Sequence, residues 1–392
     1  MKKPIILAFN RYYLPGYRAG GPIRTLANMA ARLGGDFEFR IVALNHDLGD
    51  TAAYSGIGHG RWTKHGRAQV MHLDPALVSQ RLIVDIIQQI APDILYLNSF
   101  FDPVFTQRVL WAYRLGRIGE IPIILAPRGE FSEGALGFKQ RKKRLYVRAT
   151  ALTGLYHGLV WQASSEHERA DILLNLHVVR PVDIHVAMNL ASVDDQVAVD
   201  RPLRQTGEPL RLCFLSRISP KKNLDFALSV LAAVKSQVVF TIYGPAEAPA
   251  YWVECERLIA TLPQNVKICY AGEVQPEAVR SFLAQHDLFF FPTRGENYGH
   301  VILEALAAGL PVLISDQTPW NDVTERGVGW TLSLASAAEF TRKIDEIAAW
   351  DNARITSVSK LAAEYAMEHA VKSEVIEANR ALFRSVIGDA ES

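Results

Sequence analysis

The sequence predicts an α/β protein with two doubly wound domains, and three observations lead to this prediction. First, 392 residues are too many for one ordinary hydrophobic core and suit two domains. Second, short apolar runs such as Ile5–Phe9 alternate with longer amphipathic stretches, as expected for parallel strands covered on both faces by helices. Third, this pattern starts again near residue 210. Two such domains would place a cleft between the loops at the carboxyl ends of their strands.

The expected elements follow these runs in chain order. In the first half we expect strands at Ile5–Phe9, Phe37–Ala43, Ile94–Asn98 and Pro122–Ala126. In the second half we expect strands at Leu210–Leu215, Val238–Tyr243, Val266–Tyr270, Leu288–Phe291 and Pro311–Ile314. Helices are expected at Leu224–Val234 and His300–Ala308, and the C-terminal stretch has a helical pattern with no strand.

A polar segment at 192–209, with three aspartates and two prolines, is typical of a linker. We therefore expect one domain over 1–195 and a second over 205–371. A C-terminal helix over about 372–392 is expected to pack back on the first domain.

Composition excludes several classes of protein. The chain is 49% apolar and 21% charged with a formal net charge of +1, which gives no electrostatic reason to expect a nucleic-acid partner. Cys213, Cys255 and Cys269 form no metal-ligand pair, and we expect free thiols in a core, with Cys213 and Cys269 on buried strands. The N-terminal apolar run is shorter than the roughly 7–15 residues of a signal peptide, and no run approaches the roughly 18–20 residues of a spanning helix. These features predict a cytoplasmic protein whose membrane contact, if any, is peripheral.

The segment 291–322 combines a strand end, a polar turn and a helix start. Backbone N–H groups of Gly299, His300 and Val301 at the start of the expected helix would form an anion site. Glu296 precedes this helix and Glu304 lies just over one turn into it, so the two carboxylates would accept hydrogen bonds from hydroxyl groups on either side of a diphosphate. The simpler alternative makes Glu296 a solvated loop residue and Glu304 a favourable partner of the helix dipole.

Three cations follow the first strand of the second half, namely Arg217, Lys221 and Lys222. Cations in a loop at the carboxyl end of a strand suit a diphosphate, although a solvated basic turn is the alternative. Neither G-x-G-x-x-G nor G-x4-G-K-[ST] accompanies them, which argues against an oxidoreductase and against a P-loop enzyme.

Two loops that follow expected strands of the first half also carry candidate site residues. Gly20 and Gly21 would allow a ligand to approach the backbone closely at a helix start, and a merely flexible loop is an equal alternative. Arg128 and Glu130 follow a later strand, and a basic segment comes after them.

Together these segments resemble the retaining glycosyltransferases of family 4, which have the GT-B architecture of two facing Rossmann-like domains with a cleft between them. The resemblance covers nearly the whole chain. It rests on Gly20–Gly21, the P-R-G loop and K-K-R-L-Y run within 127–146, the segment 164–166, the S-R-I-S-P-K-K-N-L-D run from Ser216, and the E-x7-E motif from Glu296 to Glu304. Thr318-Pro319-Trp320 is similar to members found in bacterial surface-polysaccharide pathways.

The resemblance implies a role for each matching residue. Arg217 and Lys222 would hold the donor diphosphate and stabilise it as the leaving group, and Glu296 would lie near the transferred sugar; these three are the predicted catalytic residues. Glu304 would bind the ribose hydroxyls. The predicted donor-binding residues are Gly20, Gly21, Arg128, Asn297, Tyr298, Gly299, His300, Val301 and Glu304. The first domain would be the acceptor side and the second the nucleotide-sugar side.

Two residues depart from the family pattern. Arg128 stands where many members have a histidine that contacts the sugar, so the hexose contacts stay open. Asn223 replaces the more common glycine after Lys222, a milder change that should leave the phosphate contacts intact.

We therefore predict a hexosyltransferase-type enzyme that moves a sugar from a nucleotide sugar to a saccharide or lipid-linked saccharide in polysaccharide biosynthesis, with retention of configuration. The sequence contains no D-x-D metal clamp, so no metal or other cofactor is expected. Two alternatives remain. A nucleotide-sugar epimerase of GT-B fold would process the donor without an acceptor. A non-catalytic nucleotide-sugar-binding subunit need not keep Arg217, Lys222, Glu296 and Glu304 together.

The segment 138–148 is strongly basic and carries Lys139, Arg141, Lys142, Lys143, Arg144 and Arg148 among apolar residues. A basic amphipathic helix of this kind docks on anionic lipid headgroups. The family resemblance suggests a polyprenyl-diphosphate-linked acceptor at the inner face of the membrane. The alternative is a solvated helix face whose apolar residues pack inward.

Overall fold

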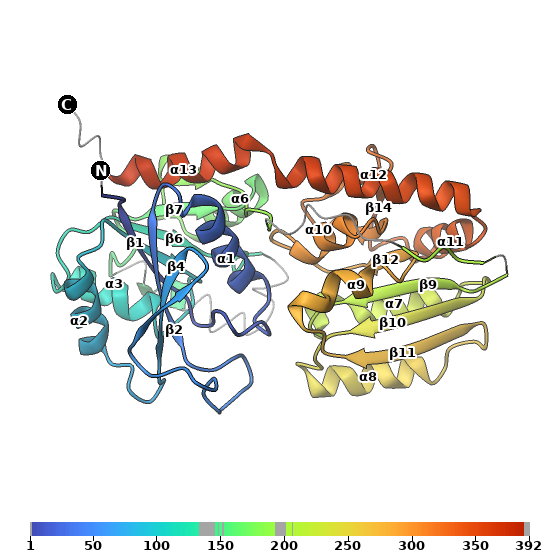
Figure 1. The fold of residues 1–392 in the computed structure, drawn as a ribbon, viewed down its shortest axis with the longest axis horizontal. Helices are drawn as coiled ribbons and strands as arrows, with labels where there is room; N and C mark the ends of the chain where they lie inside the picture. The colour runs from blue at the N-terminus through green and yellow to red at the C-terminus, as the bar shows by residue number, and fades with distance from the viewer. Residues whose placement is uncertain are drawn as a thin grey trace. The chain divides into compact units, whose positions relative to one another are not determined.

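The computed structural model describes residues 2–132, 146–147, 149–150, 153–192, 201–205 and 207–387. The chain divides into two compact units, one formed by Met1–Val193 with Lys372–Ser392 and the other by Asp194–Val371. Each unit is built on its own sheet (Figure 1). The predicted α/β class with two predominantly parallel sheets is confirmed.

The first unit contains an eight-stranded sheet in the order β3-β4-β2-β1-β5-β6-β7-β8. Its neighbouring strands run parallel, except that β3 pairs antiparallel with β4. The strands are β1 (Ile5–Phe9), β2 (Glu38–Leu44), β3 (Trp62–His65), β4 (Ala68–Leu73), β5 (Ile94–Asn98), β6 (Ile123–Ala126), β7 (Val160–Ala163) and β8 (Ile184–Val186). In β1, Leu7 and Phe9 face one core and Ile6 and Ala8 the other, which explains its unbroken apolar run.

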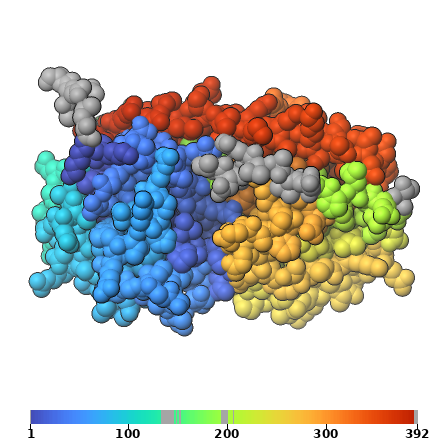
Figure 2. Space-filling view, viewed as in Figure 1, coloured from blue at the N-terminus to red at the C-terminus, as the bar shows by residue number. Residues whose placement is uncertain are grey.

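Helices cover both faces of this sheet. They are α1 (Gly21–Leu33), α2 (Gln80–Ile90), α3 (Thr106–Arg114), α6 (Glu166–Asn175) and α13 (Ser373–Ile387). α2, α3 and α6 bury their apolar sides in one core, and α1 and α13 bury theirs in the other. The C-terminal helix α13 inserts Phe383 among Phe37, Phe39 and Tyr96. Figure 2 shows this red helix lying on the blue residues of the same unit.

The second unit contains a six-stranded parallel sheet in the order β11-β10-β9-β12-β13-β14. The strands are β9 (Leu210–Leu215), β10 (Val238–Tyr243), β11 (Val266–Gly272), β12 (Leu288–Phe291), β13 (Val312–Ser315) and β14 (Gly329–Leu332). The helices are α7 (Leu224–Leu231), α8 (Pro249–Ile259), α9 (Val279–Leu283), α10 (His300–Ala307), α11 (Ala337–Ala348) and α12 (Asn352–Ala370). α7 packs with α8 and α11, whereas α10 packs with α9 and α12.

The strand order of the second unit reverses direction at β9, because β10 and β11 lie on one side of it and β12 to β14 on the other. Loops after β9 and β12 therefore leave the same sheet edge from neighbouring strands. Open α/β sheets bind ligands at such a point of reversal. The loops that carry Arg217 and Glu296 are the ones placed there.

The predicted bounds of β1, β5, β9, β10 and β12 coincide with those observed. The other predicted strands differ by one or two residues at one or both ends, and the helix expected over Leu224–Val234 ends at Leu231. The apolar pattern does not predict β3, β4, β7, β8 and β14. Four of these have only three or four residues, and β4 carries the polar residues Gln69 and His72 within its run.

The prediction that Cys269 is a buried core thiol is wrong. Cys213 and Cys255 are buried, but Cys269 is exposed on β11, which is an edge strand of the second sheet. Lys267, Cys269 and Ala271 alternate along one face of β11, and all three are exposed. An apolar run at a sheet edge therefore does not guarantee burial on both faces.

Of the basic segment 138–148, the structure describes only Tyr146 and Val147, so its expected helix lies outside the described residues. Among the helices that are described, none combines the length and the apolar character needed to cross a bilayer.

Candidate active site

The loop that carries Arg217 follows β9 and runs beside the loop that follows β10. Leu215 and Tyr243 are paired at the ends of these parallel strands, and Ile218 N donates to Pro245 O at 2.8 Å. The close approach depends on Gly244, which has a φ of +127°, and a Cβ there would lie 1.9 Å from Ser216 O. Only glycine fits such a position without movement of the backbone.

This approach brings Arg217 to a carboxylate. Arg217 Nη1 lies 2.8 Å from Glu247 Oε1, and the two side chains are 36% and 38% exposed. The pair is therefore a solvent-exposed ion pair, of the kind that adds little to stability.

Lys222 lies in the same loop and forms an ion pair with Glu296, whose side chain comes from the loop after β12. These side chains are only 14% and 12% exposed. Thr293 Oγ1 also donates to Glu296 Oε1 at 3.2 Å, and Lys222 Nζ lies 5.6 Å from the centre of the Phe291 ring. The structure thus brings together two of the three residues predicted to be catalytic.

Asn223 explains how this loop turns into α7 without glycine. It has a φ of +64°, in the left-handed region that asparagine tolerates better than most residues. Its Nδ2 donates to Pro292 O at 2.8 Å in a buried hydrogen bond. The side chain therefore ties the Lys222 loop to the end of β12, and Asn223 supplies both the backbone geometry and a contact that glycine lacks.

α10 starts next to Glu296 in the chain, at the position expected from the sequence. Gly299 precedes the helix with a φ of +78°, and no acidic side chain lies in the first turn. The turn is held by Trp320, whose indole N–H donates to Tyr298 O, and both residues are buried. Asn297 lies in this turn, whereas His300, Val301 and Glu304 lie on α10. All four residues are partly exposed, so the start of the helix can receive an anion.

In the first unit, Gly20 and Gly21 lie at the start of α1. Gly20 has a φ of +69°, and a Cβ there would meet no atom within 4 Å, so this position is open. The chain before it is held by the buried carboxylate of Asp47, which accepts from Tyr17 N at 2.7 Å and from Arg18 N at 3.0 Å. The glycine pair is therefore supported by a fixed loop, a feature that the sequence did not reveal.

Arg128 follows β6 with a φ of +59°. Its guanidinium donates hydrogen bonds to three other residues of the first unit. Nε donates to Asn98 Oδ1 at 3.1 Å, Nη1 donates to Asn189 Oδ1 at 2.7 Å, and Nη2 donates to Tyr96 OH. All three acceptors are buried and neutral. Arg128 therefore holds the ends of β5 and β6 to the chain segment that leaves the first unit.

A buried chain of hydrogen bonds extends from this arginine to α13. Tyr96 OH donates to Gln162 Oε1, and Gln162 Nε2 donates to Asn379 Oδ1 at 3.2 Å. Asn379 Nδ2 donates in turn to Met188 O at 2.8 Å. Burial raises the pKa of Tyr96, so its hydroxyl stays protonated and acts as a donor.

Two glutamates that the sequence did not single out for this purpose fix the same loop. The buried carboxylate of Glu168 accepts from Gly129 N and from Ser164 N, the latter at 2.8 Å. Glu130 accepts from Ser99 Oγ at 2.6 Å and from Phe101 N at 3.1 Å. The P-R-G loop is thus held on both sides by buried or half-buried carboxylates.

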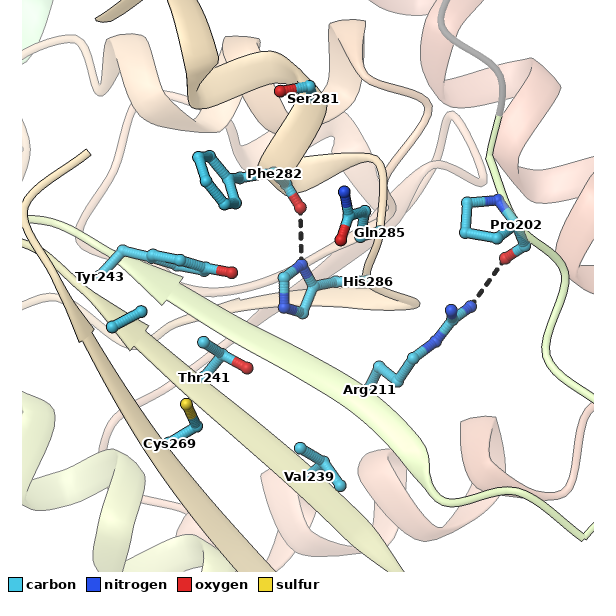
Figure 3. Close-up of a pocket in the computed structure, with 11 residues that line it drawn as sticks. Pro202, Arg211, Val239, Thr241, Tyr243, Cys269, Ser281, Phe282, Gln285 and His286 are labelled. Carbon is cyan, nitrogen blue, oxygen red and sulfur yellow. Dashed lines mark hydrogen bonds between the residues drawn. The ribbon is translucent and has the colours of Figure 1, made fainter. Parts of the chain in front are cut away.

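The second unit also has a hollow of about 640 Å³ on the uncovered face of β10 and β11 (Figure 3). None of the predicted site residues lines it. Its principal polar groups hold the fold: Arg211 Nη2 lies 2.8 Å from Asp287 Oδ1, and His286 Nδ1 donates to Phe282 O at 2.8 Å. Burial lowers the pKa of His286, which keeps the ring neutral. The candidate active site therefore stays with the loops at the sheet edge.

Among the residues that the structure describes, no group of three or more His, Cys, Asp or Glu side chains is arranged to hold a metal ion. Independence from metal stays a prediction to be measured.

Comparisons with known proteins point to one family. Residues 198–355 match the family described as Glycosyl transferases group 1. The GDP-mannose-dependent alpha-mannosyltransferase of Mycolicibacterium smegmatis is 31% identical over 123 residues, which are 30% of this chain and 30% of that protein. The amylovoran biosynthesis glycosyltransferase AmsK of Erwinia amylovora is 27% identical over 142 residues, which are 31% of this chain and 32% of that protein. The chain spans between 20% and 63% of the lengths of the curated relatives it matches.

Among solved structures, Anabaena HepE in complex with UDP-glucose superposes with a TM-score of 0.68 at 16% identity, over 97% of this chain and 99% of that one. The predicted architecture is confirmed by this agreement over nearly the whole length. The chain therefore has the GT-B fold, and its residues 198–355 are similar to the family described as Glycosyl transferases group 1.

Proposed function

We propose that the chain is a hexosyltransferase-type glycosyltransferase that transfers a sugar from a nucleotide sugar to a saccharide acceptor in surface-polysaccharide biosynthesis. One observation carries the proposal. Two cations, Arg217 and Lys222, lie in one loop at the edge of the second sheet, and Lys222 contacts Glu296 from the neighbouring loop that leads into α10. Cations, a helix start and a carboxylate at one sheet edge suit a diphosphate that is joined to groups bearing hydroxyls.

The chemistry follows from the leaving group. The bond between the anomeric carbon and the diphosphate oxygen breaks, and both electrons stay on that oxygen. Arg217, Lys222 and the N-terminal end of α10 stabilise the developing negative charge, because fixed cations and N–H groups need no reorganisation during the reaction. Glu304 accepts hydrogen bonds from the ribose hydroxyls, and Glu296 lies near the transferred sugar.

We propose further that the enzyme is of family 4 and retains the anomeric configuration. No described carboxylate is placed as an obvious nucleophile, so front-face transfer accounts for retention: the acceptor oxygen bonds to the anomeric carbon on the side the diphosphate leaves, and its proton passes to the departing phosphate. The relatives support a nucleotide-sugar donor, since one is named for GDP-mannose and one solved structure contains UDP-glucose. The amylovoran relative supports a polysaccharide pathway.

The test begins with the purified protein and a panel of UDP- and GDP-sugars, each with and without saccharide acceptors. We expect release of nucleoside diphosphate to depend on the acceptor, and proton NMR of the product to show the anomeric configuration of the donor. Conversion of the donor in the absence of any acceptor would favour the epimerase alternative. Binding of nucleotide sugar without turnover by any acceptor would favour the non-catalytic subunit.

We propose a lipid-linked acceptor at an anionic membrane surface, on the strength of the six cations within 138–148. Each cation near such a surface contributes about 1 kcal/mol, and the attraction is screened by salt. We expect the protein to sediment with anionic but not neutral liposomes, less at high salt and less when Lys142, Lys143 and Arg144 become Ser. Equal recovery with neutral and anionic liposomes would contradict this part of the proposal and leave the solvated helix face.

A further inference from the structure

Glu247 lies where a ligand of Arg217 would lie, and it was not singled out from the sequence. Its carboxylate is 2.8 Å from Arg217 Nη1. It reaches this position because the loop after β10 approaches the loop after β9 at Gly244, where any side chain would overlap Ser216 O. The carboxylate of Glu247 therefore contacts Arg217, the cation that holds the donor diphosphate under the proposed function.

The ion pair is not needed to hold these two loops together. Ile218 N donates to Pro245 O at 2.8 Å and Ser216 N donates to Tyr243 O at 3.1 Å, and both bonds are independent of the side chains. Arg217 and Glu247 are each more than one third exposed, whereas the Lys222–Glu296 pair is mostly buried. An exposed pair of this kind is easily replaced by another anion because it is weak and well hydrated.

We propose that Glu247 competes with the bound diphosphate for Arg217 and thereby speeds release of the nucleoside diphosphate product. This inference rests on the proposed function. When the diphosphate binds Arg217, Glu247 loses its partner and stands beside a second anion. When the product leaves, Glu247 takes Arg217 back. The carboxylate thus favours an empty site over an occupied one.

The competition acts more strongly on the product than on the donor. In the donor the terminal phosphate is esterified to the sugar, and it carries one charge. In the free product this phosphate has lost its ester bond and is a terminal phosphate with a second pKa near 6, so it carries about 1.5 to 2 negative charges at neutral pH. Repulsion by a fixed carboxylate grows with the charge of the ligand. Glu247 is therefore a residue that discriminates between product and donor.

The variant Glu247→Gln tests this directly, because it keeps the shape of the side chain and removes its charge. We expect UDP or GDP, whichever the native protein binds, to bind about three- to tenfold more tightly, in line with removing one like charge from an exposed site. The inhibition constant for this product should fall by a larger factor than KM for the donor. Glu254→Gln, an exposed glutamate on α8 of the same unit, is the matched control for the change in net charge and should leave both constants unchanged.

A double variant distinguishes competition between Glu247 and the diphosphate for Arg217 from a general electrostatic effect of the Glu247 charge. In the Arg217→Ala background, Glu247→Gln should no longer tighten binding, since there is no cation left to compete for. Three results would overturn the inference: no gain in Glu247→Gln, the same gain in Glu254→Gln, or an undiminished gain in the Arg217→Ala background. If instead Arg217→Ala and Lys222→Ala both bind the diphosphate like the native protein, the proposed function itself fails. The two failures are therefore distinguishable.

Discussion

Two arginines, Arg217 and Arg128, follow strands of parallel sheets in the two units, and their surroundings differ. The Arg217 side chain is 36% exposed and has a carboxylate partner, Glu247, at 2.8 Å. Arg128 donates to three buried neutral groups, with distances of 3.1 Å to Asn98 Oδ1 and 2.7 Å to Asn189 Oδ1 among them. A hydrated ion pair can exchange its anion for a ligand, whereas a guanidinium that satisfies buried acceptors cannot leave them without cost. The comparison indicates that Arg217 is available for a substrate and Arg128 is a structural anchor.

The largest expected effect is on turnover. Arg217→Ala and Lys222→Ala should each reduce kcat/KM by about 10²-fold or more, because each removes a group that stabilises the leaving diphosphate. Initial rates with a responsive donor and acceptor measure this. Circular dichroism should show both variants folded, and wild-type rates in both would contradict the assignment of the diphosphate site.

The second effect is on stability, and here the Arg128 variant should lose more than the Arg217 variant. Arg128→Met should lower the free energy of unfolding by about 2–3 kcal/mol, because Asn98, Asn189 and Tyr96 lose a charged donor and remain buried. Arg217→Ala should lower it by at most about 1 kcal/mol, as for an exposed ion pair. Urea denaturation of both variants makes the comparison. Equal losses would remove the distinction between the two sites.

A smaller effect is expected at the ribose side of the proposed site. Glu304→Ala should weaken binding of the free nucleoside diphosphate by about tenfold, because one charged acceptor contributes about 1.5–3 kcal/mol to a hydrogen bond. Calorimetric titration measures the change, and Glu254→Ala serves as a control for loss of an exposed carboxylate from the same unit. Inorganic pyrophosphate, which lacks ribose, should bind Glu304→Ala and the native protein alike. Weakened pyrophosphate binding would place Glu304 at the phosphates instead.

The smallest expected effect is that of metal removal. Initial rates should be the same with and without excess EDTA, because Arg217 and Lys222 provide the positive charge that a metal would otherwise supply. Loss of activity in EDTA that Mg²⁺ or Mn²⁺ restores would show that the charge-neutralising groups are misassigned.

The buried parts of the fold could be predicted from the sequence because both faces of their strands are covered. Runs such as Ile5–Phe9 and Leu288–Phe291 have no exposed residue, so their apolar pattern marks their ends accurately. Cys269 lies in a similar run but at an edge strand, and the run alone does not show which strand forms an edge. The sequence pattern misses β4 because His72, a polar residue, is buried within this strand.

The site could be predicted only as far as local motifs reach. The positions of Lys222 and Glu296 follow from loops after strands, and the structure brings these residues into contact. Glu247 lies 30 residues from Arg217, and their contact depends on the pairing of β9 with β10 and on Gly244. The partners of Arg128 likewise come from β5 and from the segment near Asn189. Such contacts depend on strand order, which no local motif contains.

The central claim is that Arg217 and Lys222 form the diphosphate site, and calorimetric titration tests it most directly. UDP and GDP would each be titrated into the native protein and into the double variant Arg217→Ala/Lys222→Ala at low and high salt. We expect the native protein to bind one of them, less tightly at high salt because exposed charges are screened. The double variant should bind that nucleotide at least about 100-fold more weakly, since two charged contacts are lost. Equal affinity of the native protein and the double variant for the nucleotide would contradict the claim.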